Sequence, residues 1–245
     1  MPGQEALSVS TTIAEWWREA RARQSLAKTA RQFSSKLAEF VRDSTPQRRK
    51  LRYGDADYDW EQRVNTTAAT VSWRDRLLGQ FLSPYQPTEP SLFHEMLTAL
   101  EIDFSRFTFI DIGSGKGRTL LMAADYPFQR VIGVEIVPEL HAAALENISA
   151  YKSDSQRCFA IEAHCEDARG FTFPTGSLLL YLFNPLPDAG LRAMLNRLEP
   201  ALEQQPAEVI VLYHNPELEH VFAPPRWKKL AGTHQYSTFA HLPLK

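Results

Sequence analysis

Residues 109–118 read FIDIGSGKGR, and this stretch decides the fold. A run of apolar residues ends at three glycines in alternate positions, which is typical of a β-strand that turns directly into a helix. Glycine lets the backbone turn tightly and lie against a ligand because no Cβ intervenes. The helix that follows offers free N–H groups and the positive end of its dipole. The stretch therefore predicts a nucleotide-like ligand at the end of a central strand.

Strands and helices alternate regularly from this loop onward. We expect strands at residues 107–112, 131–135, 158–162, 177–183 and 208–213, with helices at 118–126, 138–151 and 188–203 between them. Strands that are apolar on both faces and alternate with amphipathic helices are typical of a parallel sheet covered on both sides. Two further strand-like runs, 227–231 and 236–242, are too close together for a crossover helix, so this last pair must be antiparallel. The sequence predicts an α/β fold.

A proline-framed loop, residues 83–88 (SPYQPT), precedes the glycine loop. Proline fixes φ, so this segment should be rigid. It separates two predicted helices, residues 71–82 and 91–100. We name Tyr85 of this loop as a candidate catalytic residue and Thr88 as a candidate cofactor-binding residue.

The N-terminal part of the chain differs from the rest in charge. Residues 1–52 carry 11 Lys and Arg against 5 Asp and Glu, whereas the remainder carries 16 against 24. Apolar side chains at spacings of three and four predict one amphipathic helix over residues 11–43. Residues 44–58 read as a linker. We therefore divide the chain into an N-terminal helix and linker, 1–58, and a main domain, 59–245.

The basic helix has two interpretations. It could be a lid or a nucleic-acid-binding arm, or it could pack on the main domain or on a second subunit and so form a homodimer. The acidic main domain argues against a nucleic acid held through its backbone charge. We expect a small-molecule or protein substrate, with neither a nucleic-acid nor a membrane partner.

Composition limits the remaining possibilities. Hydrophobic residues make up 44% and charged residues 23% of the 245 residues, which is ordinary for a globular protein that needs no disulfides. Cys158 and Cys165 are too few for a disulfide framework. His164 stands beside Cys165, but no histidine or cysteine has the spacing of a metal site, so we expect no metal. The lack of a signal-like or membrane-spanning run predicts a cytoplasmic protein.

The glycine loop fits neither of two common nucleotide motifs. A phosphate-binding loop needs G-x-x-x-x-G-K-[ST], but Lys116 is followed by Gly117, and Ile110 stands where the first glycine belongs. A dinucleotide fingerprint needs a glycine where Arg118 stands. The pattern D-x-G-x-G-x-G, with Asp111 ahead of the glycines, instead suits a cofactor that carries an ammonium group and no phosphate. S-adenosylmethionine (SAM) is such a cofactor, and Asp111 would face its cationic methionine end directly or through water.

Acidic residues follow the next two strands. Glu135 ends the second strand, where an acid accepts hydrogen bonds from a ribose diol. Taken alone, this position fits NAD as well as SAM. Glu166 and Asp167 follow the third strand, and either could accept a hydrogen bond from an adenine amino group.

Asn184 and Pro185 follow the fourth strand. In an open α/β sheet, ligands lie outside the carboxyl ends of the strands where the strand order reverses. That point would lie between the first and fourth strands, which places Asn184 opposite Asp111. Its carbonyl oxygen could orient a nucleophilic nitrogen, or the residue could simply cap the next helix. We name Asn184 as a candidate catalytic residue and the pair His214–Asn215 as a further candidate base or orienting pair.

From about residue 85 to residue 242 the chain resembles the class I, seven-stranded SAM-dependent methyltransferases. Residues 111–117 resemble their first motif, Glu135 their ribose-binding acid and residues 166–168 their adenine motif. The Asn184-Pro185 pair resembles the Asn/Asp-Pro-Pro motif of members that methylate amino groups. Residues 85–88, with DIGSGKG after them, resemble a bacterial subgroup that is also similar to seven-stranded lysine methyltransferases.

The resemblance implies a Rossmann-like, mostly parallel seven-stranded sheet in the order 3-2-1-4-5-7-6, with the last strand antiparallel and helices on both faces. It implies SAM as the cofactor. The expected cofactor-binding residues are Asp111, Gly113, Gly115, Gly117, Glu135, Glu166, Asp167 and Thr88.

One departure bears on the acceptor. Adenine methyltransferases of this class have Asn-Pro-Pro followed by an aromatic residue, whereas residues 184–187 here read NPLP. A flipped base needs an aromatic face to stack on, which Tyr85, Tyr181 and Phe183 would supply only in part. We expect methyl transfer to an amine or other nucleophile of a small molecule or a protein lysine. The alternatives are a non-catalytic SAM-binding or protein-interaction module and a nicotinamide-dependent oxidoreductase.

Overall fold

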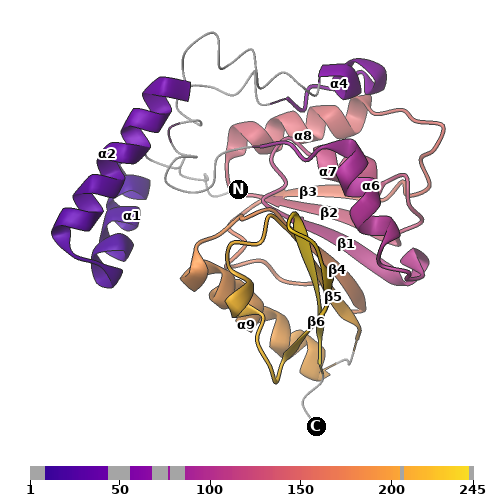
Figure 1. Ribbon diagram of the computed structural model, residues 1–245. Coiled ribbons are helices and arrows are strands. Elements are labelled where there is room, and N and C mark those ends of the chain that lie inside the picture. Colours follow the sequence, from indigo (N-terminus) through magenta and orange to yellow (C-terminus); the bar gives the residue numbers. More distant parts are fainter. Residues whose placement is uncertain (1–8, 44–55, 68–76, 78–85, 205–206, 243–245) are drawn as a thin grey trace, which may run out of the picture.

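The computed structural model describes residues 9–43, 56–67, 77, 86–204 and 207–242. A seven-stranded sheet forms the centre of the α/β body, in the order β3-β2-β1-β4-β5-β7-β6 (Figure 1). The strands are β1 (Phe107–Ile112), β2 (Arg130–Glu135), β3 (Ile161–Cys165), β4 (Ser177–Leu182), β5 (Val209–His214), β6 (Trp227–Gly232) and β7 (Tyr236–His241). This order confirms the predicted Rossmann-like topology.

Five strands of the sheet are parallel. β1 pairs with β2 and with β4, β2 pairs with β3, and β4 pairs with β5, all in parallel. β7 inserts between β5 and β6 and is antiparallel to both. The carboxyl ends of the five parallel strands therefore meet at one edge of the sheet, where the strand order reverses beside β1.

Helices cover both faces of the sheet (Figure 1). The helices α6 (Pro90–Thr98), α7 (Arg118–Ala123) and α8 (Pro138–Ala150) lie on one face, and α9 (Asp188–Gln204) lies on the other. Each face buries its own apolar cluster, because successive strand side chains point to opposite sides. Ile110 and Ile112 of β1 belong to the cluster under α9, whereas Phe107 and Phe109 belong to the cluster under α6 and α7.

The same alternation selects which polar side chains share a face at the carboxyl edge. Asp111 pairs in register with Tyr181, which itself packs in the cluster under α6 and α7. Asp111 lies two residues after Phe109 of the same cluster and so points to the same face. His214 ends β5 two residues after Leu212, which lies in that same cluster. The sheet therefore places Asp111, Tyr181 and His214 on one face, at the edge where ligands bind.

The N-terminal segment is a helical hairpin, and the prediction of one helix over residues 11–43 is wrong. It consists of α1 (Val9–Arg23) and α2 (Leu26–Asp43), which break at residues 24–25. Ser25 accepts a hydrogen bond from Lys28 N at 3.5 Å in the manner of an N-cap, which favours a new helix start there. Folding back also closes an aromatic cluster that a single helix could not bury, since Phe33 lies 6.1 Å from Trp16 and 5.7 Å from Trp17.

Two other boundaries differ from the sequence prediction. The strand expected at residues 158–162 lies at Ile161–Cys165, because residues 157–158 instead donate backbone hydrogen bonds to Ala124 O. A short helix, α4 (Ala56–Gln62), begins within the predicted linker. The helix expected over residues 71–82 and the candidate Tyr85 lie outside the described residues, apart from residue 77.

No helix in the described ranges combines the length and the apolar character needed to cross a bilayer. Within the same ranges, no group of three or more His, Cys, Asp and Glu side chains is arranged to hold a metal ion.

Candidate functional site

A cavity of about 570 Å³ opens at the carboxyl edge of the parallel strands. It is lined by residues that follow all five of these strands, from the loops at 111–114, 134–137, 166–168, 183–188 and 215–218. The loop 86–88 adds a further wall, and the hairpin contributes Trp16, Arg23 and Lys36. The ligand site predicted from the glycine loop therefore coincides with this cavity.

The glycine loop adopts a backbone that favours glycine. Gly113, Gly115 and Gly117 have φ values of 82°, 53° and 83°, in the left-handed region. Gly113 N and Ser114 N both donate to Val134 O, at 2.8 and 3.1 Å, which ties the loop to the end of β2. A Cβ at Gly113 would lie 3.0 Å from Pro185 Cβ. The loops after β1 and β4 therefore approach so closely that a side chain at Gly113 would have to displace one of them.

Asp111 lies buried at the floor of the cavity. Thr119 Oγ1 donates a hydrogen bond to its Oδ2. Burial raises the pKa of Asp111 to about 7, the hydrogen bond from Thr119 lowers it in part, and the neighbouring charge of Glu135 raises it. A carboxyl held in this state gains most from a cationic ligand, which would replace the solvation that burial has removed.

Glu135 is a buried acid that joins the glycine loop to the end of β2. Its two oxygens accept hydrogen bonds from Gly115 N and Val137 N, each at 2.8 Å. Burial raises the pKa of Glu135, and these backbone hydrogen bonds oppose that shift. Each carboxylate oxygen has a further lone pair, so a ribose hydroxyl could still bind there. That contact stays a prediction.

Glu166 and Asp167 line the cavity after β3, as the sequence predicted. Arg169 holds Asp167 through its Nε, at 2.8 and 3.0 Å from the two carboxylate oxygens. Although burial raises the pKa of Asp167, the hydrogen bonds and charge of Arg169 lower it overall. Glu166 N donates to Glu135 O at 3.1 Å, which fixes the wall beside the ribose-binding candidate. A hydrogen bond from an adenine amino group to either acid stays a prediction.

The two cations of the glycine loop bind protein groups. Lys116 Nζ donates to Thr67 O at 2.9 Å. Arg118 Nε donates to Thr66 Oγ1 at 2.7 Å, and its Nη2 lies 3.2 Å from Asp59 Oδ1. Both cations are buried, and burial lowers the pKa of Lys116 to about 8, which the charge of Asp59 opposes and that of Arg118 enhances. The loop therefore gives little support to a phosphate ligand, in agreement with the motif analysis.

Residues 56–67, which we call the strap, form the surface that receives these cations. Asp59 organises the strap by accepting hydrogen bonds from Thr66 N and Thr67 N at 2.6 and 2.9 Å. Asn147 of α8 joins the strap to the glycine loop, because its Oδ1 accepts a hydrogen bond from Asn65 N at 2.7 Å and its Nδ2 donates one to Lys116 O at 2.9 Å. Sequence reasoning missed the strap, because no spacing rule links its residues to the loop. The only available signal was a pair of cations inside a buried motif, which require nearby acceptors.

Asn184 links the loops that follow β4 and β5. Its Oδ1 accepts a hydrogen bond from Tyr213 Oη at 2.7 Å, and its Nδ2 donates to Asn215 O at 2.7 Å. Its backbone has a φ of 46°, in the left-handed region that Asn tolerates better than most residues. Asn184 and Asp111 line the same cavity, but the amide of Asn184 already serves this link. A role toward a nucleophile stays a prediction.

A second polar group on the cavity wall was only partly foreseen. Thr88 Oγ1 lies 2.7 Å from Tyr181 Oη, which lies 2.8 Å from His214 Nδ1. Thr88 and Tyr181 line the cavity, and all three residues are buried. Sequence analysis named Thr88 and His214 for separate reasons, and Tyr181 only as an aromatic surface. The parallel pairing of β4 with β5, in which Tyr181 lies opposite Leu212, brings Tyr181 beside His214.

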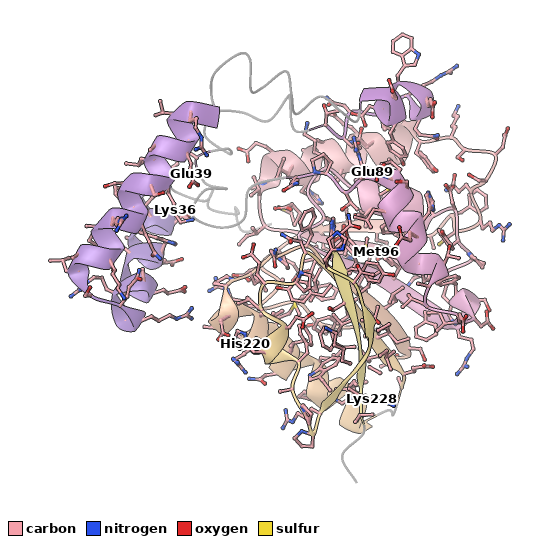
Figure 2. The ribbon with its side chains drawn as sticks, in the orientation of Figure 1. Lys36, Glu39, Glu89, Met96, His220 and Lys228 are labelled. Carbon is pink, nitrogen blue, oxygen red and sulfur yellow. The ribbon has the colours of Figure 1, made fainter. Side chains whose placement is uncertain are left out.

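The hairpin forms the outer wall of the cavity. Trp16 and Arg23 of α1 and Lys36 of α2 line it, on the side of the body where the parallel strands end (Figure 1). Figure 2 shows Lys36 and Glu39 on the edge of α2 nearer the α/β body. Burial lowers the pKa of Lys36, which the charges of Glu39 and Glu217 oppose. The lid interpretation of this segment is therefore compatible with its position.

Comparison with known proteins adds a family match. Residues 105–187 match the model of a family described as "Putative methyltransferase". This segment contains β1, the glycine loop, Glu135 and Asn184. No curated protein sequence matches the chain.

Solved structures with a similar fold include methyltransferases of several kinds. A ribosomal protein L11 methylase from Lactobacillus delbrueckii subsp. bulgaricus is 16% identical, with 62% of this chain and 74% of that chain covered and a TM-score of 0.42. An RNA methyltransferase from Salinibacter ruber, in complex with S-adenosyl-L-homocysteine, is 22% identical over 63% and 92% of the two chains, with a TM-score of 0.39. A predicted N6-adenine-specific DNA methylase from Listeria monocytogenes is 15% identical over 64% and 51%, with a TM-score of 0.46.

The residues at the cavity fit SAM. The buried carboxyl groups of Asp111 and Glu135 line the cavity, whereas Lys116 and Arg118 of the glycine loop bind protein groups. Among the described residues, the buried Ser114 hydroxyl has no hydrogen-bond partner. The apolar side chains of Val137 and Leu140 complete this half of the cavity. The family match over residues 105–187, the sheet order and the D-x-G-x-G-x-G loop agree with these features, and together they support a Rossmann-like methyltransferase fold with SAM as the cofactor.

Proposed function

We propose that the protein transfers the methyl group of SAM to an amine nitrogen, on a small molecule or a protein lysine. The observation that carries this proposal is the chemistry of the acceptor half of the cavity. Asn184, Thr88 and Tyr181 line the cavity there, together with the acids Asp188 and Glu217, of which Asp188 also pairs with Arg192 and His220. Such a wall favours an acceptor that donates hydrogen bonds or carries positive charge.

The protein's contribution would be placement of the two reactants. SAM supplies the methyl group and its own sulfur leaving group. Asp111, Gly113 and Glu135 would hold it, since they line the cavity, and Gly115 would support them through the hydrogen bond from its N–H to Glu135. Gly117, Glu166 and Asp167 would also contribute to this binding. Fixing the acceptor nitrogen in line and excluding water would provide most of the rate enhancement.

The nature of the acceptor is best tested by following the methyl group itself. Methyl-labelled SAM would be incubated with the protein and with fractions of a cell extract, namely small molecules, proteins, RNA and DNA. The proposal predicts label in the small-molecule or protein fraction. RNA and DNA belong in this panel because an RNA methyltransferase and a DNA methylase are among the similar structures. Label in the RNA or DNA fraction alone would contradict an amine acceptor of the proposed kind.

Asn184 can be tested in the same assay. Asn184→Ala removes the link between the loops after β4 and β5, so we expect roughly tenfold slower transfer with cofactor affinity retained. Full activity in this variant would remove Asn184 from the acceptor site.

We also propose a cytoplasmic location and a homodimer formed through the hairpin. Sedimentation of the purified protein would test the homodimer.

A further inference from the structure

The Thr88–Tyr181–His214 chain is unusual for its surroundings. Rings of Phe93 and Phe109 lie 5.6 and 6.2 Å from the Tyr181 ring, and the Phe183 ring lies 3.9 Å from that of His214. Three polar side chains in such an apolar setting need a complete hydrogen-bond pattern or a ligand. Whether the three side chains satisfy one another or need a ligand depends on which atoms carry the protons.

Donor and acceptor chemistry orients the chain toward His214. Burial lowers the pKa of His214 to about 4, so the ring is neutral near pH 7 and one of its nitrogens is an acceptor. A phenol is a stronger donor than an aliphatic hydroxyl, and an imidazole nitrogen is the strongest acceptor of the three groups. We assign the proton of the neutral ring to Nε2, so that Tyr181 Oη donates to His214 Nδ1 and Thr88 Oγ1 donates to Tyr181 Oη.

This orientation uses the single proton of each hydroxyl. Each oxygen keeps lone pairs and no free hydrogen. Because Thr88 and Tyr181 both line the cavity, they present only acceptors to whatever binds beside them. A carboxylate or phosphate would find no donor there, whereas an N–H group would find two acceptors.

Building on the proposed methyl transfer, we propose that Thr88 and Tyr181 are the amine-recognition wall of the acceptor site, with His214 as the residue that positions Tyr181. The two oxygens accept hydrogen bonds from the two N–H groups of a neutral primary amine. Its nitrogen lone pair then remains free for the reaction. Thr88 is thereby assigned to the acceptor and not to the cofactor.

The chemistry of the transfer favours such a wall. The nitrogen lone pair forms the new N–CH₃ bond, the S–CH₃ bond breaks with its electrons left on sulfur, and the positive charge moves from sulfur to nitrogen. The N–H groups become more acidic as this charge develops, so hydrogen bonds to Thr88 and Tyr181 strengthen during the step. The step needs no further reactant.

The test compares two cofactor analogues whose affinities do not depend on knowing the substrate. Sinefungin carries an amine in place of the transferable S-methyl group, whereas S-adenosylhomocysteine carries nothing there. Calorimetry would give the dissociation constants of both for wild type, Tyr181→Phe and Thr88→Val. We expect each variant to lose roughly tenfold in sinefungin affinity and to keep its S-adenosylhomocysteine affinity within about twofold. Thr88→Ser, which retains the hydroxyl, should bind both analogues like wild type.

Two further variants separate recognition from structure. His214→Phe should weaken sinefungin selectively, by a smaller factor than Tyr181→Phe. Tyr126→Phe removes a different Tyr–His hydrogen bond, from Tyr126 Oη to His94 Nδ1 at 2.9 Å, outside the cavity lining, and should change neither affinity. Should Tyr181→Phe fail to fold, the comparison of Thr88→Val with Thr88→Ser remains.

Each other outcome has a distinct meaning. An equal loss of both analogues would assign the wall to the cofactor and overturn the inference, as would unchanged sinefungin affinity in all variants. If wild type binds neither analogue, the proposed function itself fails.

Discussion

Asp111 shows how one residue couples the fold to the ligand. Burial raises its pKa to about 7 in the folded chain, whereas a carboxyl of an unfolded chain titrates near pH 4. Between these values the folded state holds a proton that the unfolded state has released. The free energy of unfolding from this group is therefore greatest below about pH 4 and falls as pH rises to about 7. Ligand binding follows the opposite trend, because a cation binds the ionised form.

The affinity for SAM should therefore depend on pH. We expect the dissociation constant to rise as pH falls below 7, by at most about tenfold per pH unit, because protonated Asp111 no longer attracts a cation. Calorimetric titrations between about pH 5.5 and 7.5 would measure it. Asp111→Asn should bind SAM weakly with a much flatter profile. A flat profile in wild type would show that Asp111 does not meet the cationic end of the cofactor.

At the scale of elements, the strap and the glycine loop form one unit. Asp59→Asn removes the charge that faces buried Arg118, so we expect the free energy of unfolding to fall by about 3 kcal/mol. Affinity for S-adenosylhomocysteine should fall as well, because Arg118 begins the helix that follows the loop. Urea unfolding and calorimetry measure the two effects.

Asp57→Asn is the matched control for the strap, since Asp57 lies two residues away on α4 and is exposed. Its stability should stay within about 0.5 kcal/mol of wild type. Equal stability and affinity in wild type and Asp59→Asn would contradict a role for the strap in holding the loop.

The strap also marks the limit of what the sequence could predict. Alternating apolar strands and amphipathic helices have local periodicity, so most strands, Asp111 and Glu135 could be placed from the pattern, while the order of the seven strands followed from the family resemblance. The contact of Asp59 with Arg118 spans 59 residues and follows no period. The break at residue 25 was missed for a related reason, because the apolar spacing continues across it and only the partner helix decides where the chain folds back.

At the scale of the whole molecule, the hairpin completes a cavity that the α/β body opens. Arg23 contributes to the cavity wall, whereas Arg21 of the same helix does not. If the hairpin takes part in acceptor binding, Arg23→Ala should lower kcat/KM for the acceptor by roughly tenfold and leave cofactor affinity unchanged. Arg21→Ala is the control of equal charge change. Equal kcat/KM in both variants would exclude Arg23 from acceptor binding.

We propose that this cavity binds SAM through the loop after β1. Calorimetry with S-adenosylhomocysteine tests it on wild type, Gly113→Arg and Gly176→Arg. Both glycines have positive φ, but a Cβ at Gly113 would meet Pro185, whereas one at Gly176 would meet nothing within 4 Å. We predict binding with a dissociation constant on the order of micromolar for wild type and Gly176→Arg, and none for a folded Gly113→Arg. No binding to wild type, or equal binding to all three proteins, would contradict the claim.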